Sequence, residues 1–150
     1  MAALQWMTRS FEQRHGIATV FRSSHESLPA LPPGVPLVAY RTVQEALTNV
    51  SKHAKASRVT VDLSLAHGVL SLEIVDNGRG LDEGALAKAR SFGIRGLHER
   101  AGTVGGWIDL SSGPGGTMLI LSVPLDHALR PPPEEGSPLG PGSVDAQAWG

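Results

Sequence analysis

Apolar residues repeat along this chain with two different periods, and each period predicts one type of element. Near the amino terminus they recur every third or fourth position, which predicts a helix over residues 4–14 that Gly16 ends. Apolar and polar residues alternate over 58–65 and again over 69–75. Because side chains alternate between the two faces of a strand, this period of two predicts a pair of neighbouring strands.

Proline, glycine and further apolar periodicity place the remaining elements. The longest helical pattern covers residues 36–54, and Pro36 suits its first turn because the N–H that proline lacks would be unpaired there. Gly105 and Gly106 end a later helical pattern. The other expected elements are a strand over 17–21, a loop over 28–36, a tight connection over 66–68, a turn over 76–80, a short helix over 82–89, a loop over 91–96, a helix over 97–104, and strands over 107–111 and 117–123 around a glycine-rich turn at 113–116.

This order of elements predicts the α+β fold class. Helices interleaved with hairpin-connected strands suggest a two-layer α/β sandwich with helices on one face of the sheet. The sheet should be mixed and mainly antiparallel, because several connections are too short for a crossover. Residues 126–150 are rich in proline and glycine and have little to bury, so we expect a folded domain over 1–125 and a disordered tail.

Composition and charge narrow the classes of function. The chain has 150 residues, of which 41% are hydrophobic, enough for one domain with a core. A net charge of -1 gives no electrostatic basis for a nucleic-acid or anionic-membrane partner. The chain has no cysteine, which excludes thiol chemistry, and no apolar run long enough to span a bilayer. We expect a cytoplasmic domain with no direct membrane contact.

The long helix at 36–54 has two faces with different chemistry. An angle of 100° per residue gathers the apolar residues on one arc and the polar ones on nearly the opposite face. The polar face has two interpretations, either a solvated surface with cations near the negative end of the helix dipole, or a site for Mg²⁺ and phosphate. The apolar arc holds Val43, Ala46, Leu47, Val50 and Ala54, and the polar face holds Glu45, Asn49 and Lys52, with His53 at its edge.

The segment Asp76-Asn77-Gly78-Arg79-Gly80 follows a predicted strand. A hairpin turn is one interpretation, since Asn-Gly is a common hairpin loop, but residues 81–87 do not alternate as a return strand would. The other is a ligand site, in which glycines allow close approach and the Asp76 carboxylate accepts a hydrogen bond from an amine such as that of adenine. The spacing fits neither a P-loop nor a dinucleotide-binding loop.

Two further glycine segments allow the same pair of interpretations. Residues 91–97 place two glycines before a helix, which indicates either a simple loop and cap or a mobile loop whose following N–H groups favour phosphate. Residues 113–117 form a hairpin turn by themselves, and the Thr117 hydroxyl could reach a site for a base.

Taken together, these segments resemble a known family. Residues 41–54 resemble the asparagine box of nitrate-sensor-type histidine kinases, and residues 76–80 resemble the first glycine box. Residues 93–101 resemble the second glycine box, and residues 115–117 the third. All four occur in the family's order between residues 38 and 124, which makes the combination far more specific than any one segment.

The resemblance implies the Bergerat-type ATP-binding fold of gyrase, heat-shock chaperone ATPases, mismatch-repair ATPases and histidine kinases. It implies that Asp76 binds the adenine amine, that Asn49 holds Mg²⁺ against the phosphates, and that a mobile lid lies around 90–96. Glu45 matches the position often proposed as a base. The residues that it assigns to ATP are Asn49, Lys52, His53, Asp76, Gly78, Gly80, Gly93, Ile94, Arg95, Gly96, Leu97, Gly116 and Thr117.

One expected feature of the family is missing from the sequence. The subfamily carries its phosphoaccepting histidine in a His-Asp/Glu motif, and neither His15 nor His25 lies in such a motif. We therefore expect an ATP-binding catalytic domain of a longer two-component kinase, whose histidine lies on a separate dimerisation domain and whose product passes to a response regulator. Two alternatives stay open: an anti-sigma-factor-type serine kinase, and a nucleotide-gated binding module without catalysis.

Overall fold

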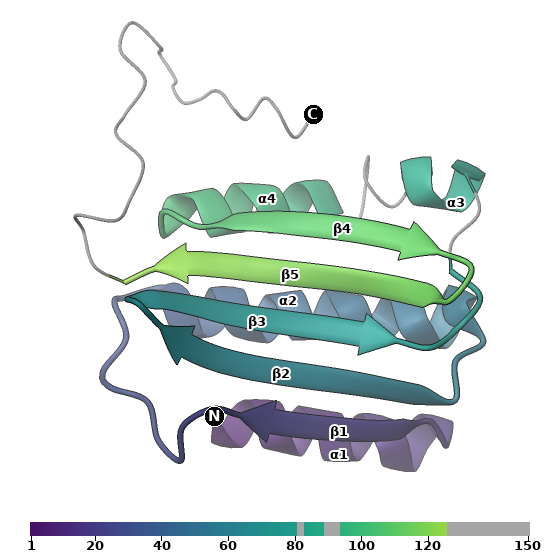
Figure 1. Ribbon diagram of the computed structural model, residues 1–150, viewed down its shortest axis with the longest axis horizontal. Helices are drawn as coiled ribbons and strands as arrows, with labels where there is room; N and C mark the ends of the chain where they lie inside the picture. The colour runs from purple at the N-terminus through teal and green to yellow at the C-terminus, as the bar shows by residue number, and fades with distance from the viewer. Residues whose placement is uncertain (81–82, 89–93, 126–150) are drawn as a thin grey trace, which may run out of the picture.

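The structure is a computed structural model that describes residues 1–80, 83–88 and 94–125. Within them the chain forms two layers, a five-stranded sheet and a layer of helices on one of its faces (Figure 1). The expected tail over 126–150 lies outside the described residues. In chain order the elements are α1 (Ala2–His15), β1 (Ala18–Ser23), α2 (Val35–Asn49), the π-helical turn η1 (Val50–Ala54), β2 (Arg58–Ala66), β3 (Val69–Asp76), α3 (Glu83–Lys88), α4 (Ile94–Thr103), β4 (Trp107–Gly113) and β5 (Gly116–Pro124).

Among the strands that the structure describes, the order is β1-β2-β3-β5-β4 and only the β1–β2 pair is parallel. This confirms the predicted mixed, mainly antiparallel sheet. The parallel pair requires a crossover, which the chain makes through α2 and η1. Helices α1, α2 and α4 pack against β1, the centre of the sheet and β4, respectively.

The core lies between the two layers, where alternate strand residues meet the apolar arc of α2. In β3 the residues Leu70, Leu72 and Ile74 are buried while their neighbours are half-buried on the other face, so the period of two predicted this face correctly. From α2 and η1 the core receives Val43, Ala46, Leu47 and Val50, as the helical pattern predicted, while the side chain of Ala54 lies outside what the structure describes. Full burial of a side chain of this size contributes about 1.5–3 kcal/mol.

Turn residues with positive φ end several elements where the sequence placed them. Gly16 ends α1 with φ 69°, and its N–H donates to the Glu12 carbonyl at 2.8 Å. His67 and Gly68 have φ of 55° and 77°, the left-handed pair that a tight two-residue hairpin requires between β2 and β3.

Two helix boundaries differ from the prediction. Helix α4 begins at Ile94, so the expected loop over 91–96 is wrong for its last three residues. Ile94 and Leu97 are both buried in the core, and this apolar contact extends the helix through Gly96, which by itself disfavours helix. At the other boundary, the continuous α-helix expected to Ala54 gives way to the π-helical turn after Asn49.

Candidate functional site

One end of the molecule gathers the segments that the sequence singled out. Strand β3 ends there at Asp76, which pairs with Val59 near the start of β2 and with Thr117 near the start of β5. Because only residues 55–57 separate η1 from β2, the carboxyl end of the α2–η1 helix lies at this same end (Figure 1). The fold therefore brings together the first and third glycine segments and the polar end of the long helix.

Among the described residues, Asp76 is the charged side chain that is buried at this end. It is 5% exposed because it occupies a core-facing position of β3. Its Oδ1 atom accepts a hydrogen bond from the Gly78 N–H at 2.8 Å, and the carboxylate also accepts one from the Thr117 N–H. Burial is the largest influence and raises the pKa of Asp76, while the two N–H donors act against it.

These contacts determine what Asp76 can still bind. A carboxylate has about four lone-pair sites, and two backbone donors leave some of them for a further donor. A neutral amide side chain in place of this carboxylate would have one acceptor oxygen, and its NH₂ group would face one of the two N–H donors. A buried carboxylate with acceptor capacity left is therefore suited to a ligand with an exposed amine.

A pair of hydroxyl groups lies beside this carboxylate, and the sequence interpretation identified only one of them. The Ser112 Oγ and Thr117 Oγ1 atoms are 2.8 Å apart, on paired residues of the β4–β5 hairpin. Ser112 was missed. The signal was present in the sequence, because counting outward from the glycine-rich turn at 113–116 places residue 112 opposite residue 117.

The glycines of the first and third segments have a steric role within the fold. A Cβ atom on Gly80 would collide with the Gly113 carbonyl oxygen, and one on Gly116 would collide with the Asp76 carbonyl oxygen. Gly80 has φ 77° and Gly116 has φ 135°, conformations that glycine adopts at little cost. The buried Gly78 donates to Asp76. Contact of Gly78, Gly80 or Gly116 with a ligand stays a prediction.

The polar residues of the long helix occupy its last turns. Glu45 and Asn49 are half-buried on α2, with Asn49 as its final residue, and Lys52 is exposed on η1. His53 also lies in η1, but its side chain is outside what the structure describes. Among the described residues no three His, Asp or Glu side chains gather as a metal site would require.

The second glycine segment is described only in part. Gly93 lies outside the described residues, as does most of the predicted lid. Ile94 and Leu97 point into the core, Arg95 is exposed and Gly96 is half-buried in the first turn of α4. Any contribution of Ile94 or Leu97 to a ligand must therefore come from the backbone.

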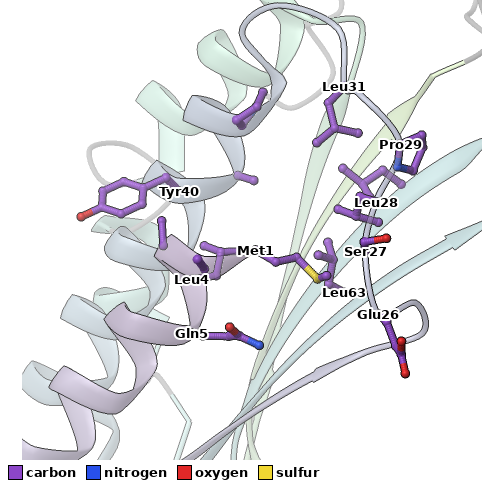
Figure 2. A pocket seen from close by; sticks show the side chains of 15 residues that line it. Met1, Leu4, Gln5, Glu26, Ser27, Leu28, Pro29, Leu31, Tyr40 and Leu63 are labelled. Carbon is purple, nitrogen blue, oxygen red and sulfur yellow. The ribbon is translucent and has the colours of Figure 1, made fainter.

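A cavity lies at the other end of α2, away from Asp76. It has a volume of about 520 Å³ between the start of α1, the loop before α2, and strands β2 and β3. Figure 2 shows Met1 reaching into it from α1 toward Leu63. Tyr40 and Leu28 contribute to its mainly apolar wall, and Glu26 is the charged side chain among the residues that line it.

The fold and site define the class of this protein, an ATP-binding domain with a buried aspartate at the end of a central strand. Residues 34–127 match the family model described as histidine kinase-, DNA gyrase B-, and HSP90-like ATPase, and the chain belongs to this family. The match confirms the family resemblance, and the nitrate-sensor subtype stays a prediction. Within the described part of the chain, no helix is both long and apolar enough to cross a membrane.

Curated proteins with similar sequences include histidine kinases. Sensor histidine kinase LiaS of Bacillus subtilis (strain 168) is 41% identical over 97 residues, which make up 64% of this chain and 27% of that protein. Signal transduction histidine-protein kinase/phosphatase DegS of Brevibacillus brevis is 35% identical over 123 residues, 81% of this chain and 31% of that protein. The chain thus spans about a third or less of these curated relatives.

Solved structures show the same fold at lower identity. The histidine kinase domain of the blue-light activated histidine kinase of Erythrobacter litoralis EL346 aligns with a TM-score of 0.66 and 22% identity, covering 81% of this chain and 59% of that one. The Acinetobacter baumannii histidine kinase AdeS aligns with a TM-score of 0.68 and 12% identity, covering 84% and 64%. At this identity the likeness supports the two-layer fold alone.

Proposed function

We propose that this chain is the ATP·Mg²⁺-binding catalytic domain of a two-component sensor histidine kinase. The observation that carries the proposal is Asp76, a buried carboxylate that accepts two backbone hydrogen bonds and has acceptor capacity left at the end of a central strand. The adenine amine is the donor that completes this set. Gly80 and Thr117 support the base through ordered water.

The phosphates lie toward the carboxyl end of α2. Asn49 offers an amide oxygen, and Glu45 lies one turn before it with a half-buried carboxylate, so the available ligands are the hard oxygens that Mg²⁺ prefers. When bound, Mg²⁺ neutralises charge on the phosphates. Lys52 donates to phosphate oxygens, with His53 nearby, and Glu45 is in position to order a water or accept a proton.

The nucleophile comes from a different domain. His15 is exposed at the end of α1, where its ring lies 4.6 Å from that of Phe11, and His25 is exposed in the loop after β1. The chain therefore supplies the nucleotide half of the reaction, and a dimerisation domain of the same protein supplies the histidine that receives the γ-phosphoryl group. A response regulator is the next acceptor, and the domain works on the cytoplasmic side.

Titration and transfer experiments test this proposal. Calorimetric titration of the chain with a non-hydrolysable ATP analogue should show binding that strengthens with Mg²⁺. Absence of binding would contradict the proposal and support the alternative of a binding module without catalysis. The chain incubated alone with labelled ATP should stay unlabelled.

Addition of a separately prepared phosphoacceptor domain should give acid-labile, base-stable label on that domain, because phosphohistidine is lost in acid. An acid-stable phosphate ester on a partner would instead support the anti-sigma-factor-type serine kinase. Acid-labile label on the isolated chain would contradict the proposed division of labour.

A further inference from the structure

The residue after Asp76 makes a set of hydrogen bonds that ties two distant segments together. The Asn77 Oδ1 atom accepts from the N–H groups of Ser57 at 3.0 Å and Arg58 at 2.9 Å. Its Nδ2 atom donates to the Ser57 Oγ atom at 3.0 Å, and its own N–H donates to the Arg58 carbonyl at 3.2 Å. We call this set of four bonds the Asn77 clasp.

The clasp holds the segment by which the long helix leaves the predicted phosphate site. Only residues 55 and 56 separate η1 from Ser57. Both η1 and Lys55 have unusual backbone conformations, since η1 is a π-helical turn and Lys55 is left-handed with φ 50° and ψ 42°. A left-handed conformation costs a residue other than glycine about 1–3 kcal/mol and persists only where its surroundings fix it.

Two neighbouring residues therefore act on the two halves of the candidate site. Asp76 lies on the core face of the sheet and supplies the acceptor for a base. Asn77 is exposed and fixes the segment that follows η1, the turn that carries Lys52. The position of Lys52 relative to Asp76 depends on residues 55–58, and the clasp anchors those residues directly to the end of β3.

We propose that Asn77 is a positioning residue for the nucleotide. Through the clasp it sets where η1 and Lys52 stand relative to Asp76, so that one ligand can reach both. This inference rests on the proposed function, in which Asp76 binds the base and η1 lies at the phosphates. A residue that only stabilises a turn would have a different effect, because its loss would change the folded fraction and weaken all ligands equally.

The test compares ATP with a ligand that lacks phosphates. Adenosine uses the Asp76 half of the site, whereas ATP with Mg²⁺ uses both halves. In Asn77→Ala, water replaces the exposed bonds, so the fold should survive. Affinity for ATP with Mg²⁺ should fall about tenfold, equivalent to about 1.4 kcal/mol, while affinity for adenosine should change less than about twofold.

Two matched variants complete the design. Ser57→Ala removes the bond to the Ser57 hydroxyl and keeps the other three bonds of the clasp, so it should weaken ATP binding less than Asn77→Ala does. Asp62→Ala removes the two bonds that tie Arg22 of β1 to β2, far from the site, and should leave the ratio of ATP to adenosine affinity unchanged. Thermal unfolding of each variant reports the folded fraction.

The outcomes separate this inference from the function on which it rests. Failure of the unsubstituted chain to bind ATP overturns the proposed function and the positioning role with it. If the unsubstituted chain binds ATP, an equal loss for ATP and adenosine in Asn77→Ala, or no loss for either, overturns the positioning role alone. A selective loss for ATP supports it.

Discussion

Replacement of Asp76 by asparagine should have different effects on ATP affinity and on the free energy of unfolding. In Asp76→Asn the side chain keeps its shape but loses one acceptor oxygen, and its NH₂ group must face the Gly78 N–H, the Thr117 N–H or the adenine amine. A hydrogen bond to a charged group contributes about 1.5–3 kcal/mol, so loss of about 2–3 kcal/mol should weaken ATP binding about 30- to 150-fold.

The same substitution should change stability little. Burial raises the pKa of Asp76, which means that the fold favours a neutral side chain at this position relative to the unfolded chain. That gain opposes the loss of one hydrogen bond to the backbone, so we expect the free energy of unfolding to stay within about 1 kcal/mol of the original value.

Calorimetric titration with ATP and Mg²⁺, together with urea unfolding, measures both quantities. Asp109→Asn serves as the control, because it removes one exposed carboxylate from β4 at a distance from the site and should leave ATP affinity unchanged. If Asp76→Asn bound ATP as well as the original chain does, the assignment of Asp76 to the adenine amine would be refuted. A large loss of stability would refute the account of its burial.

Three further predictions concern two glycines, the left-handed residue Lys55 and the titration of Asp76. Gly80→Ala should cost more than about 2 kcal/mol of stability in urea unfolding, because its Cβ collides with the Gly113 carbonyl, whereas Gly102→Ala, on open helix surface in α4, should stabilise by up to about 1 kcal/mol. Equal effects of the two would contradict the steric argument. Lys55→Gly should raise the free energy of unfolding by up to about 1 kcal/mol, because glycine adopts a left-handed conformation at little cost. A decrease in the free energy of unfolding would show that contacts of the lysine side chain outweigh the cost of this conformation. ATP affinity should decline as the pH falls through the raised pKa of Asp76, because binding needs the ionised carboxylate, and a flat affinity profile would contradict this. The stabilising contribution of the protonated carboxyl is present at low pH and is lost as the pH rises through that pKa, so a free energy of unfolding that stays constant over this range would contradict the account of its burial.

Local pattern was sufficient to predict most of the fold. The alternation in β2 and β3 identified the buried face, and the apolar arc of α2 identified the core of the helical layer, because burial is what imposes both periods. The first and third glycine segments carry residues that the fold requires at a fixed place, since a Cβ atom on Gly80 or Gly116 would collide with a backbone carbonyl.

Features that depend on contacts between distant segments could not be predicted in the same way. The Asn77 clasp joins residues about twenty positions apart, and nothing near Asn77 in the sequence indicates that its partners are Ser57 and Arg58. The start of α4 at Ile94 depends on core contacts that override the two glycines beside it. Steric exclusion at Gly80 arises because the β4–β5 hairpin passes over it.

The first helix and strand, α1 and β1, lie before the residues that match the family model and still contribute to the fold. The family match begins at residue 34, yet α1 buries Leu4, Met7 and Phe11 in the common core and β1 covers the edge of β2. A chain cut at residue 34 would leave β2 with an open row of N–H and C=O groups beside an uncovered apolar surface, which is the usual starting point for aggregation. The length of chain that carries the candidate site is therefore shorter than the length that builds the common core and sheet.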